Sequence, residues 1–473
     1  MESSRNLHGD LEAMRVFFRS GRTKEASWRK SQLRGVLAFL MENEREIMMA
    51  LKQDLGKHHA EAFRDEIGIL IKSLNYALKS LKAWMSPKQV VPILVKLPVI
   101  AVLSTAELLP EPLGQVLIFS SWNFPFGLSL EPLIGAFAAG NTVVLKPSEL
   151  APACSSLLAN TMTTYLDGNA VKVVEGGPSV GNARVGRIVM AAAVKHLTPV
   201  ALELGGKCPA VLDSLSCYWD REVAIKRILV GKFGTCAGQV CITIDYVLVE
   251  KKFLSTAVEL MKAVTEKMFG ENPRETNTVA RIVNKQHFLR LKNLVDDPRV
   301  TASIVYGGKM DEENLFIEPT ILVDPPLESE IMTEEIFGPL LPIITLEKIE
   351  DSIEFIKSRP RPLTIYAFTK SKTLERRMIS ETSSGSVVFN DAIIQYAADT
   401  IPFGGIGESG MGRYHGKYSF EAFSHEKAVV RRSYLSEFWF RFPPWNEYKL
   451  QLFREQSHFV FFWGPLLQIV ATI

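Results

Sequence analysis

The sequence has little net charge, few cysteines and few chemically distinctive clusters. Its 54 Lys and Arg residues nearly balance 52 Asp and Glu, leaving a formal net charge of +2. The basic residues are dispersed, so nothing indicates a nucleic-acid partner. Five cysteines in 473 residues are too sparse, and odd in number, for a disulfide framework. We therefore expect a reducing, cytosol-facing compartment. No metal site is predicted, because Cys236 and Cys241 are poorly spaced for a zinc knuckle.

The two ends of the chain differ in apolar character. The N-terminal MESSRNLHGDLEAM lacks the charged start and apolar core of a secretory signal. Residues 459–473 contain no charged side chain, but Gly464 and Pro465 interrupt them. Spanning a bilayer takes ~20 apolar residues, which exceeds this run. Two interpretations stay open: an interfacial or shallow tail anchor, and a segment docked on the protein.

The order of expected elements favours an α/β fold. Residues 10–84 place apolar side chains three and four apart, which predicts several amphipathic helices, with Gly56 as a stop signal. Residues 90–109 are β-rich and punctuated by proline, which favours an extended, hairpin-like arm. From residue 115, strand-like and helix-like runs alternate: QVLIFS, LEPLIGAFAAG, TVVLKPSE, a helix over about 151–166, and VKVVEGG. This alternation predicts right-handed βαβ crossovers in a doubly wound sheet. The run QVLIFS suits a strand buried on both faces.

Two motifs follow expected strands, where such sheets bind ligands. Asn123, in SWNFP, offers a side-chain amide that could stabilise an oxyanion, although asparagine also commonly begins loops. Lys146 and Glu149, in LKPSE, could hydrogen-bond ribose hydroxyls. They could equally mark a solvated helix start with Ser148 as N-cap.

Two further motifs could carry reactive groups. Glu203 precedes Gly205 and Gly206, where the backbone can approach a ligand closely. A carboxylate in an apolar setting has a raised pKa and can act as a general base, but a paired surface glutamate is the simpler interpretation. Cys241, in GQVC, follows a turn of small residues that leaves its sulfur accessible. Most single cysteines are inert. Only a thiolate attacks carbon, and nearby positive charge or N–H groups favour it by lowering the pKa of the thiol.

The joint order of the motifs resembles the aldehyde dehydrogenase superfamily. The chain carries WNFP, KPSE, ELGGK, GQVC, EEIFGP and PFGGIGESGMG in that order. The short N-terminus and the ending GMGRYHGKYSFEAFSH are similar to the class 3, fatty-aldehyde-like branch, of plant type. The resemblance covers roughly residues 10–432.

The resemblance implies oxidation of an aldehyde, medium- or long-chain or aromatic, to a carboxylic acid through a covalent thioester. Cys241 would attack the carbonyl carbon, and Asn123 with the backbone N–H of Cys241 would hold the oxyanion. Glu203 would activate the water that cleaves the thioester. Cys236 has no role in this scheme.

The implied cofactor is NAD, and members of this branch also accept NADP. Lys146 and Glu149 would bind the adenosine ribose, while Glu335, Phe337 and Trp122 would position the nicotinamide half. By the same resemblance, three residues would line the substrate funnel or the adjoining loop: Asn390, Phe403 and His415.

The resemblance also implies a domain plan. A Rossmann-type NAD(P)-binding domain would comprise residues 1–91 and 113–203, and an α/β catalytic domain residues 204–398. A β-rich oligomerisation arm would comprise residues 92–112 and 399–432, followed by an extension, 433–473, with the apolar tail. We expect a cytoplasmic homodimer that detoxifies lipid aldehydes, with the tail as an attachment to the cytosolic face of a membrane such as the endoplasmic reticulum.

One stretch departs from the family pattern. Only nine residues separate Val174 from the expected helix start at Arg184. A parallel crossover with its helix needs at least ~10–12 residues, before a second strand is counted. We therefore expect an internal deletion near residues 181–182 that removes one βα unit and impairs dinucleotide binding. This favours a second hypothesis, a catalytically impaired isoform that serves as a non-catalytic subunit. A third is ester hydrolysis through Cys241 without a cofactor.

Overall fold

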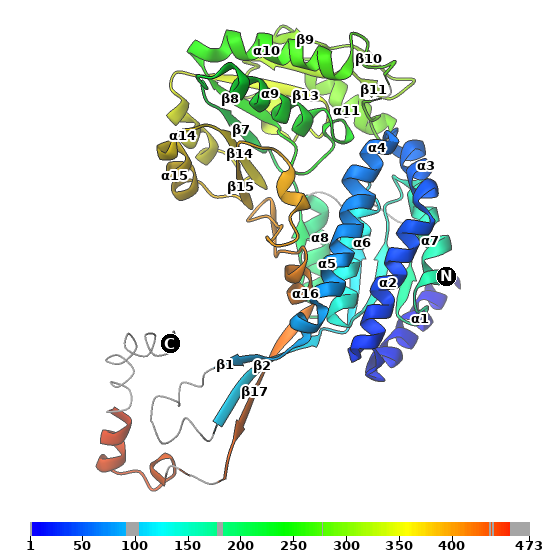
Figure 1. Cartoon of the computed structure of the whole chain (residues 1–473), viewed down its shortest axis with the longest axis vertical. Helices are drawn as coiled ribbons and strands as arrows, with labels where there is room; N and C mark the ends of the chain where they lie inside the picture. Colours follow the sequence, from blue (N-terminus) through cyan, green and yellow to red (C-terminus); the bar gives the residue numbers. More distant parts are fainter. Residues whose placement is uncertain are drawn as a thin grey trace. The chain divides into compact units, whose positions relative to one another are not determined.

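The computed structural model describes residues 2–90, 104–176, 183–276, 278–434, 437 and 439–454 (Figure 1). The chain divides into two compact units. Unit 1 comprises Met1–Trp84 and Pro112–Ser424, and unit 2 comprises Met85–Glu111 and His425–Ile473. This division does not separate residues 113–203 from 204–398, so the boundary expected there stays a prediction.

Helices form the N-terminal part of unit 1, as the apolar spacing predicts. The third of them ends at Gly56, whose φ of 66° suits a residue without a Cβ. The predicted stop signal is thus confirmed. A π-helical segment at Phe63–Ile67 joins the last two helices. The helices are α1 (Glu2–Arg19), α2 (Ala26–Glu42), α3 (Glu44–Leu55), α4 (His59–Ala62) and α5 (Gly68–Met85).

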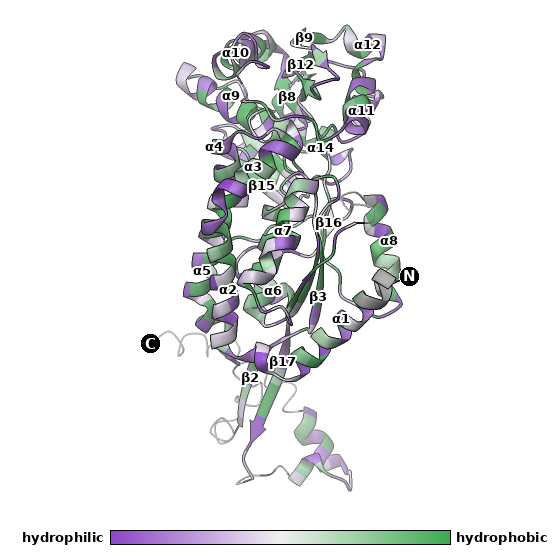
Figure 2. Ribbon diagram, turned by 90° about the vertical axis from the view of Figure 1, so that its right-hand side faces the viewer, coloured by the Kyte–Doolittle hydropathy of each residue, from purple (hydrophilic) through white to green (hydrophobic). Residues whose placement is uncertain are grey.

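A small parallel sheet follows, in the order β3-β4-β5. Helices α6 (Gly127–Ala139) and α7 (Pro152–Tyr165) connect its strands, so the predicted alternation of strands and helices is confirmed. Figure 2 shows α6 and α7 on one side of β3 and α1 on the other. The strands are β3 (Gln115–Phe119), β4 (Thr142–Lys146) and β5 (Val171–Val173).

Strand β3 is not buried on both faces, and the expectation for QVLIFS is wrong in this respect. Leu117 is 54% exposed and Phe119 is 40% exposed, whereas Val116 and Ile118 are buried. In the described part of the chain, β3 pairs with β4 alone and is the edge of its sheet. Successive side chains of a strand point to opposite faces. One face of β3 is therefore covered, and the other, which α1 also contacts, is open at Leu117 and Phe119.

The helix after this sheet, α8 (Ala183–Val194), has an uncovered apolar surface. Its Gly186 lies close to Leu202 and Leu204, while Ile188 and Val194 are 61% and 69% exposed. Green turns of α8 in Figure 2 mark this apolar character. Val174–Gly176, the described residues between β5 and α8, contain no strand. Residues 181–182, where the deletion is expected, lie outside the described residues.

A second sheet, of seven strands, forms the core of the remainder of unit 1. Its order is β15-β14-β7-β8-β13-β12-β9, and its strands are parallel except β9. The strands are β7 (Pro209–Leu212), β8 (Tyr246–Glu250), β9 (Ile304–Tyr306), β12 (Thr320–Val323), β13 (Leu340–Leu346), β14 (Thr364–Phe368) and β15 (Ser386–Phe389). The main helices around it are α9 (Tyr218–Lys232), α10 (Lys251–Phe269), α11 (Lys285–Val295), α13 (Glu330–Thr333), α14 (Ser352–Lys357) and α15 (Lys372–Glu381).

A short antiparallel ladder pairs β6 (Leu202–Glu203) with β16 (Gly410–Met411). The glycine-dense segment that the sequence singles out therefore closes back on the strand carrying Glu203. Helix α16 (Lys417–Ala422) follows β16 and packs against α6.

Unit 2 contains a three-stranded sheet, β1-β2-β17. Its strands are β1 (Lys88–Val90), β2 (Ser104–Pro112) and β17 (Ser424–Arg432). Ion pairs join β2 to β17, including Lys427 with Glu111 at 2.7 Å. None of the helices in the described ranges combines the length and apolar character that crossing a bilayer requires. The apolar run 459–473, expected as an anchor or docked segment, lies outside these ranges.

Candidate active site

The loop carrying Cys241 lies between α9 and β8 and is strongly bent. Three successive residues, Cys236, Ala237 and Gly238, have φ of 46°, 50° and 76°. Gln239 holds this bend: its side-chain amide donates to the carbonyl of Cys236 at 2.9 Å and accepts from Val283 N–H at 3.1 Å. A left-handed backbone is costly for residues with a Cβ, so the buried glutamine stabilises an otherwise unfavourable turn. This accounts for the glutamine of GQVC.

Cys241 is the partly exposed cysteine of this loop. Cys236 is fully buried, as are Cys154 and Cys208, while Cys217 is exposed elsewhere. Residue 241 is therefore partly open to solvent, and the thiol of Cys236 is shielded from it.

Glu203 stands close enough to Cys241 for its charge to raise the pKa of the thiol. Both oxygens of Glu203 are buried, and neither accepts a hydrogen bond from any described residue. Burial holds the pKa of this carboxyl well above its ordinary value of 4.5. Glu203 is thus not a paired surface glutamate, and its environment suits a general base.

Asn123 is buried, and its side chain reaches the cysteine loop. The amide Nδ2 donates to the carbonyl of Gln239 at 2.9 Å, two residues before Cys241. A primary amide has two N–H groups, and the second has no acceptor among the described residues. One N–H anchors Asn123 to the cysteine loop, and the other is left for a ligand.

The pKa of the Cys241 thiol is raised, contrary to the expected lowering. Burial is the main cause, and the carboxylates of Glu203 and Glu335 add to it. The backbone N–H groups of Cys241 and Ile242 act in the opposite direction but are outweighed. The reason is that the surrounding charges are negative, whereas a thiolate is favoured by positive ones.

Glu335 lies against the glycine pair that follows Glu203. Its Oε1 accepts a hydrogen bond from Gly206 N–H at 3.0 Å. A Cβ on Gly205 would fall 2.3 Å from the same oxygen, so this close approach requires glycine. Burial raises the pKa of Glu335 to about 7. The motifs ELGGK and EEIFGP are therefore in contact, through two residues that are 129 positions apart in the sequence.

Two predicted cofactor residues are aromatic neighbours. The rings of Trp122 and Phe337 meet edge to face, with centroids 5.4 Å apart. Phe337 has a φ of 50°, which is strained for a residue with a side chain. The loop that carries Phe337 is held by Arg290, which donates to the carbonyl of Glu335 at 3.2 Å.

Lys146 and Glu149 lie at the carboxyl end of β4, where an open α/β sheet binds its ligand. They form an ion pair at 2.7 Å. Lys146 is nearly buried and Glu149 is partly exposed. A carboxylate at this edge can accept hydrogen bonds from ribose hydroxyls. Lys146 and Glu149 therefore fit the nucleoside half of a dinucleotide. Ser148 is not the N-cap of α7, since that position belongs to Ala151.

The remaining predicted residues lie in less accessible or more structural positions. Asn390 accepts a hydrogen bond from Thr369 N–H at 2.9 Å and so fixes a loop after β15. Phe403 is 7% exposed. His415 is fully buried beside the rings of Tyr396 and Tyr414, at 4.9 and 5.4 Å. A funnel wall must be exposed to substrate, which His415 is not.

Sequence reasoning missed a buried charge network beneath Glu335. Lys207 donates to Asp245 at 2.6 Å and to the carbonyls of Ile331 and Glu334, both at 2.8 Å. Asp245 also accepts from Ile336 N–H at 3.2 Å. The lysine of ELGGK was the available signal. Asp245 follows no motif and could not be found by spacing.

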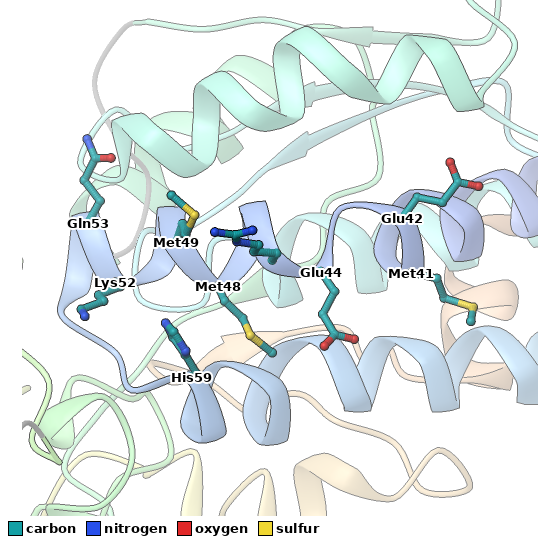
Figure 3. Close-up of a pocket in the computed structure, with 9 residues that line it drawn as sticks. Met41, Glu42, Glu44, Met48, Met49, Lys52, Gln53 and His59 are labelled. Carbon is teal, nitrogen blue, oxygen red and sulfur yellow. The ribbon is translucent and has the colours of Figure 1, made fainter.

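Figure 3 shows a surface depression apart from these residues. Its lining side chains come from α2, α3 and α4, and no candidate site residue is among them. They are Met41, Glu42, Glu44, Arg45, Met48, Met49, Lys52, Gln53 and His59.

The small parallel sheet is of the type that binds dinucleotides, and the α/β domain joined to it carries a partly exposed cysteine and a buried base. Together these features define an NAD(P)-dependent oxidoreductase. A model of the aldehyde dehydrogenase family matches residues 5–429, and the chain therefore belongs to this family. The family oxidises aldehydes to carboxylic acids with NAD or NADP.

Relatives cover nearly the whole chain. Aldehyde dehydrogenase family 3 member F1 of Arabidopsis thaliana is 52% identical over an alignment of 459 residues that covers 94% of each chain. The dimeric, NADP-preferring aldehyde dehydrogenase of Rattus norvegicus is 40% identical, covering 91% of this chain and 96% of the relative. The substrate-bound AldH of Staphylococcus aureus has a TM-score of 0.89 and 38% identity, covering 95% and 99%. The predicted class 3, plant-type membership is confirmed.

Proposed function

We propose that this chain oxidises medium- or long-chain, or aromatic, aldehydes with Cys241 as the nucleophile. The observation that carries the proposal is the unpartnered carboxylate of Glu203 close to Cys241, the partly exposed cysteine of the loop. A base without hydrogen bonds in a dry setting is poised to take a proton. The apolar run 459–473 supports lipid-derived substrates met at a membrane surface.

The residues have distinct roles in this mechanism. Cys241 adds to the carbonyl carbon, and the free N–H of Asn123 with the backbone N–H of Cys241 receives the developing negative charge. One such donor contributes ~3 kcal/mol to transition-state stabilisation. When bound, NAD or NADP supplies the hydride acceptor. Lys146 and Glu149 would hold its adenosine ribose, and Glu335, Phe337 and Trp122 would orient its nicotinamide end. Glu203 then takes a proton from the water that cleaves the thioester.

A second candidate function, a catalytically impaired subunit, is favoured by one observation. Only residues 174–182 separate β5 from α8, and the described part of the small sheet has three strands. A helix N-terminus beside the sheet is where a pyrophosphate binds, and the shortened connection alters this region. We propose that dinucleotide affinity is reduced, and that the chain can pair with an intact subunit.

One experiment on the purified protein separates these candidates. Turnover of hexanal, nonanal and benzaldehyde is measured by NADH and NADPH formation, and NADH binding by fluorescence titration. Micromolar NADH binding, with turnover abolished in Cys241→Ala and reduced about 10²–10⁴-fold in Glu203→Gln, supports the enzyme. Absence of both binding and turnover supports the impaired subunit. Turnover that survives Cys241→Ala contradicts the proposed nucleophile.

A further inference from the structure

A buried ion pair outside the six motifs lies behind the loop that carries Asn123. Lys57 and Glu66 are both 0% exposed, and their Nζ and Oε1 atoms are 2.7 Å apart. Lys57 lies between α3 and α4, and Glu66 lies in the π-helical segment. Burying two charges is costly, and a well-packed apolar pair would fill the same space at no such cost. A role in holding neighbouring groups would account for the pair.

Both members of the pair form hydrogen bonds with the loop from Asn123 to Gly127. Lys57 Nζ donates to the carbonyl of Asn123 at 2.8 Å and lies 4.0 Å from the ring centroid of Phe124. Glu66 Oε2 accepts from the N–H groups of Phe126 at 2.9 Å and Gly127 at 3.1 Å. The first residue of the loop and its last two residues are therefore fixed by one charged unit.

The same helical segment also reaches the cysteine loop. Glu61 Oε1 accepts from Cys236 N–H at 2.6 Å. The Cys236 thiol lies 3.5 Å from the carbonyl of Asn123, which Lys57 also contacts. Asn123 itself donates to Gln239. The segment from Lys57 to Glu66 thus sets the distance between the loop with the oxyanion donor and the loop with the nucleophile.

Holding the carbonyl of Asn123 also directs its side chain. The carbonyl and the side-chain amide belong to one residue, so a rotation of its backbone would move Nδ2 away from the carbonyl of Gln239 and from the cysteine loop. A displacement of ~1 Å can cost ~10²-fold in rate, because the donor must meet the charge as it forms.

We propose that Lys57, held by Glu66, is a positioning residue that orients Asn123 for oxyanion binding at Cys241. The inference rests on the proposed function, since it requires Cys241 to be the nucleophile. Neither residue touches the substrate, and the effect passes through Asn123.

The test follows acylation of Cys241 without a dinucleotide. The pre-steady-state burst of p-nitrophenolate from p-nitrophenyl acetate gives the acylation rate and the number of working sites. The variants are Lys57→Met, Asn123→Ala and the double variant, with Cys241→Ala as the blank. The matched control is Arg29→Met: Arg29 is 3% exposed and donates to the carbonyls of Thr23 and Ala138, both at 3.0 Å. The Arg29→Met variant also loses buried hydrogen bonds, but none of them reaches Asn123.

The proposal expects non-additivity. Lys57→Met lowers the acylation rate per working site at least tenfold, with KM for the ester changed less than twofold. On the Asn123→Ala background the same change lowers the rate less than twofold. Arg29→Met leaves the rate per working site within twofold of wild type. Equal losses on both backgrounds, or equal losses in Lys57→Met and Arg29→Met, overturn the proposal.

A second variant decides the matter where Lys57→Met does not fold. Glu66→Gln keeps the volume of the side chain and an acceptor for Lys57, but replaces one acceptor by a donor. We expect at least a threefold loss of acylation rate, which disappears on the Asn123→Ala background; a loss that persists there overturns the proposal.

A burst that survives Cys241→Ala refutes the proposed nucleophile, and the positioning role falls with it. A burst lost in Cys241→Ala but additive in the other variants refutes the positioning role alone.

Discussion

Glu203 shows how the chemistry of one residue can oppose its contribution to folding. Its buried oxygens accept no hydrogen bond from the described residues, and its pKa is raised by burial. A group that must ionise in the folded state at neutral pH, without partners, weakens that state. Natural active sites commonly trade stability for activity in this manner.

We expect the Glu203→Gln variant to be more stable to unfolding than wild type, and to lack the pH dependence of stability that the Glu203 carboxyl causes. Below pH 4.5 the wild-type carboxyl is protonated in both folded and unfolded states, so it makes no difference there. Because the folded-state pKa is raised above 4.5, the wild type loses stability as pH rises from about 4.5 toward the raised pKa, and the loss is complete above it. Glu203→Gln should therefore unfold at higher denaturant concentration than wild type at pH 8, and equally at pH 4.

The activity should depend on pH in the opposite direction to the stability. Thioester hydrolysis needs the carboxylate, so its rate should rise with pH through the raised pKa and flatten in Glu203→Gln. Denaturant titration and deacylation rates at matched pH values measure both effects. Equal stability of the two proteins at pH 8 would contradict the burial argument.

At this scale the sequence predicted the reactive groups but not what holds them. The order of the motifs indicated Asn123, Glu203 and Cys241, because short patterns around glycine encode local chemistry. Lys57 and Asp245 lie in no pattern, since their roles depend on contacts 66 and 91 residues away. The pKa of Cys241 was predicted in the wrong direction, because the sequence does not show that two carboxylates face the sulfur.

Among the elements, β3 and α8 carry the departure from the family pattern. The sequence predicted their existence and order correctly. It predicted β3 as buried on both faces, because an apolar run alone cannot reveal whether a neighbouring strand is present. The exposed Leu117 and Phe119 on β3, with Ile188 and Val194 on α8, form apolar surface that soluble proteins usually cover.

The open strand predicts self-association that a single charge should suppress. Leu117→Lys places a charge on the uncovered face of β3, as natural edge strands do. We expect weaker binding of a hydrophobic dye and less aggregation by light scattering, with an unchanged circular dichroism spectrum. Leu113→Lys is the matched control, because Leu113 is 45% exposed but precedes the strand. Equal effects of both substitutions would show that solubility, and not the strand edge, is responsible.

The whole molecule combines a large unit with a small one whose sheet ends in β17. Val430, on this strand, is 69% exposed. Exchange of such an arm between copies would cover this surface, which is the arrangement that the expected homodimer would need. Compact units follow from contacts across hundreds of residues, so the composition of residues 90–109 indicated an extended arm, while its second segment followed only from family resemblance.

Val430→Lys should therefore weaken dimerisation. A charge at an apolar contact between copies must be desolvated, which raises the dissociation constant. Sedimentation velocity over a concentration series measures the change, and Val430→Thr, which keeps a branched side chain, is the control. Identical sedimentation of Val430→Lys and wild type would place the interface elsewhere.

The pairing of Glu203 with Gly410 has a consequence for the growing chain at the ribosome. Roughly 200 residues of polypeptide must be made between the two strands, which takes ~10–40 s at ~5–20 residues per second. For most of that interval the thiol at position 241 has already been synthesised, while the ladder that fixes its neighbouring base is incomplete. Nascent chains should therefore acquire esterase competence late, after their cysteine has become vulnerable to oxidants.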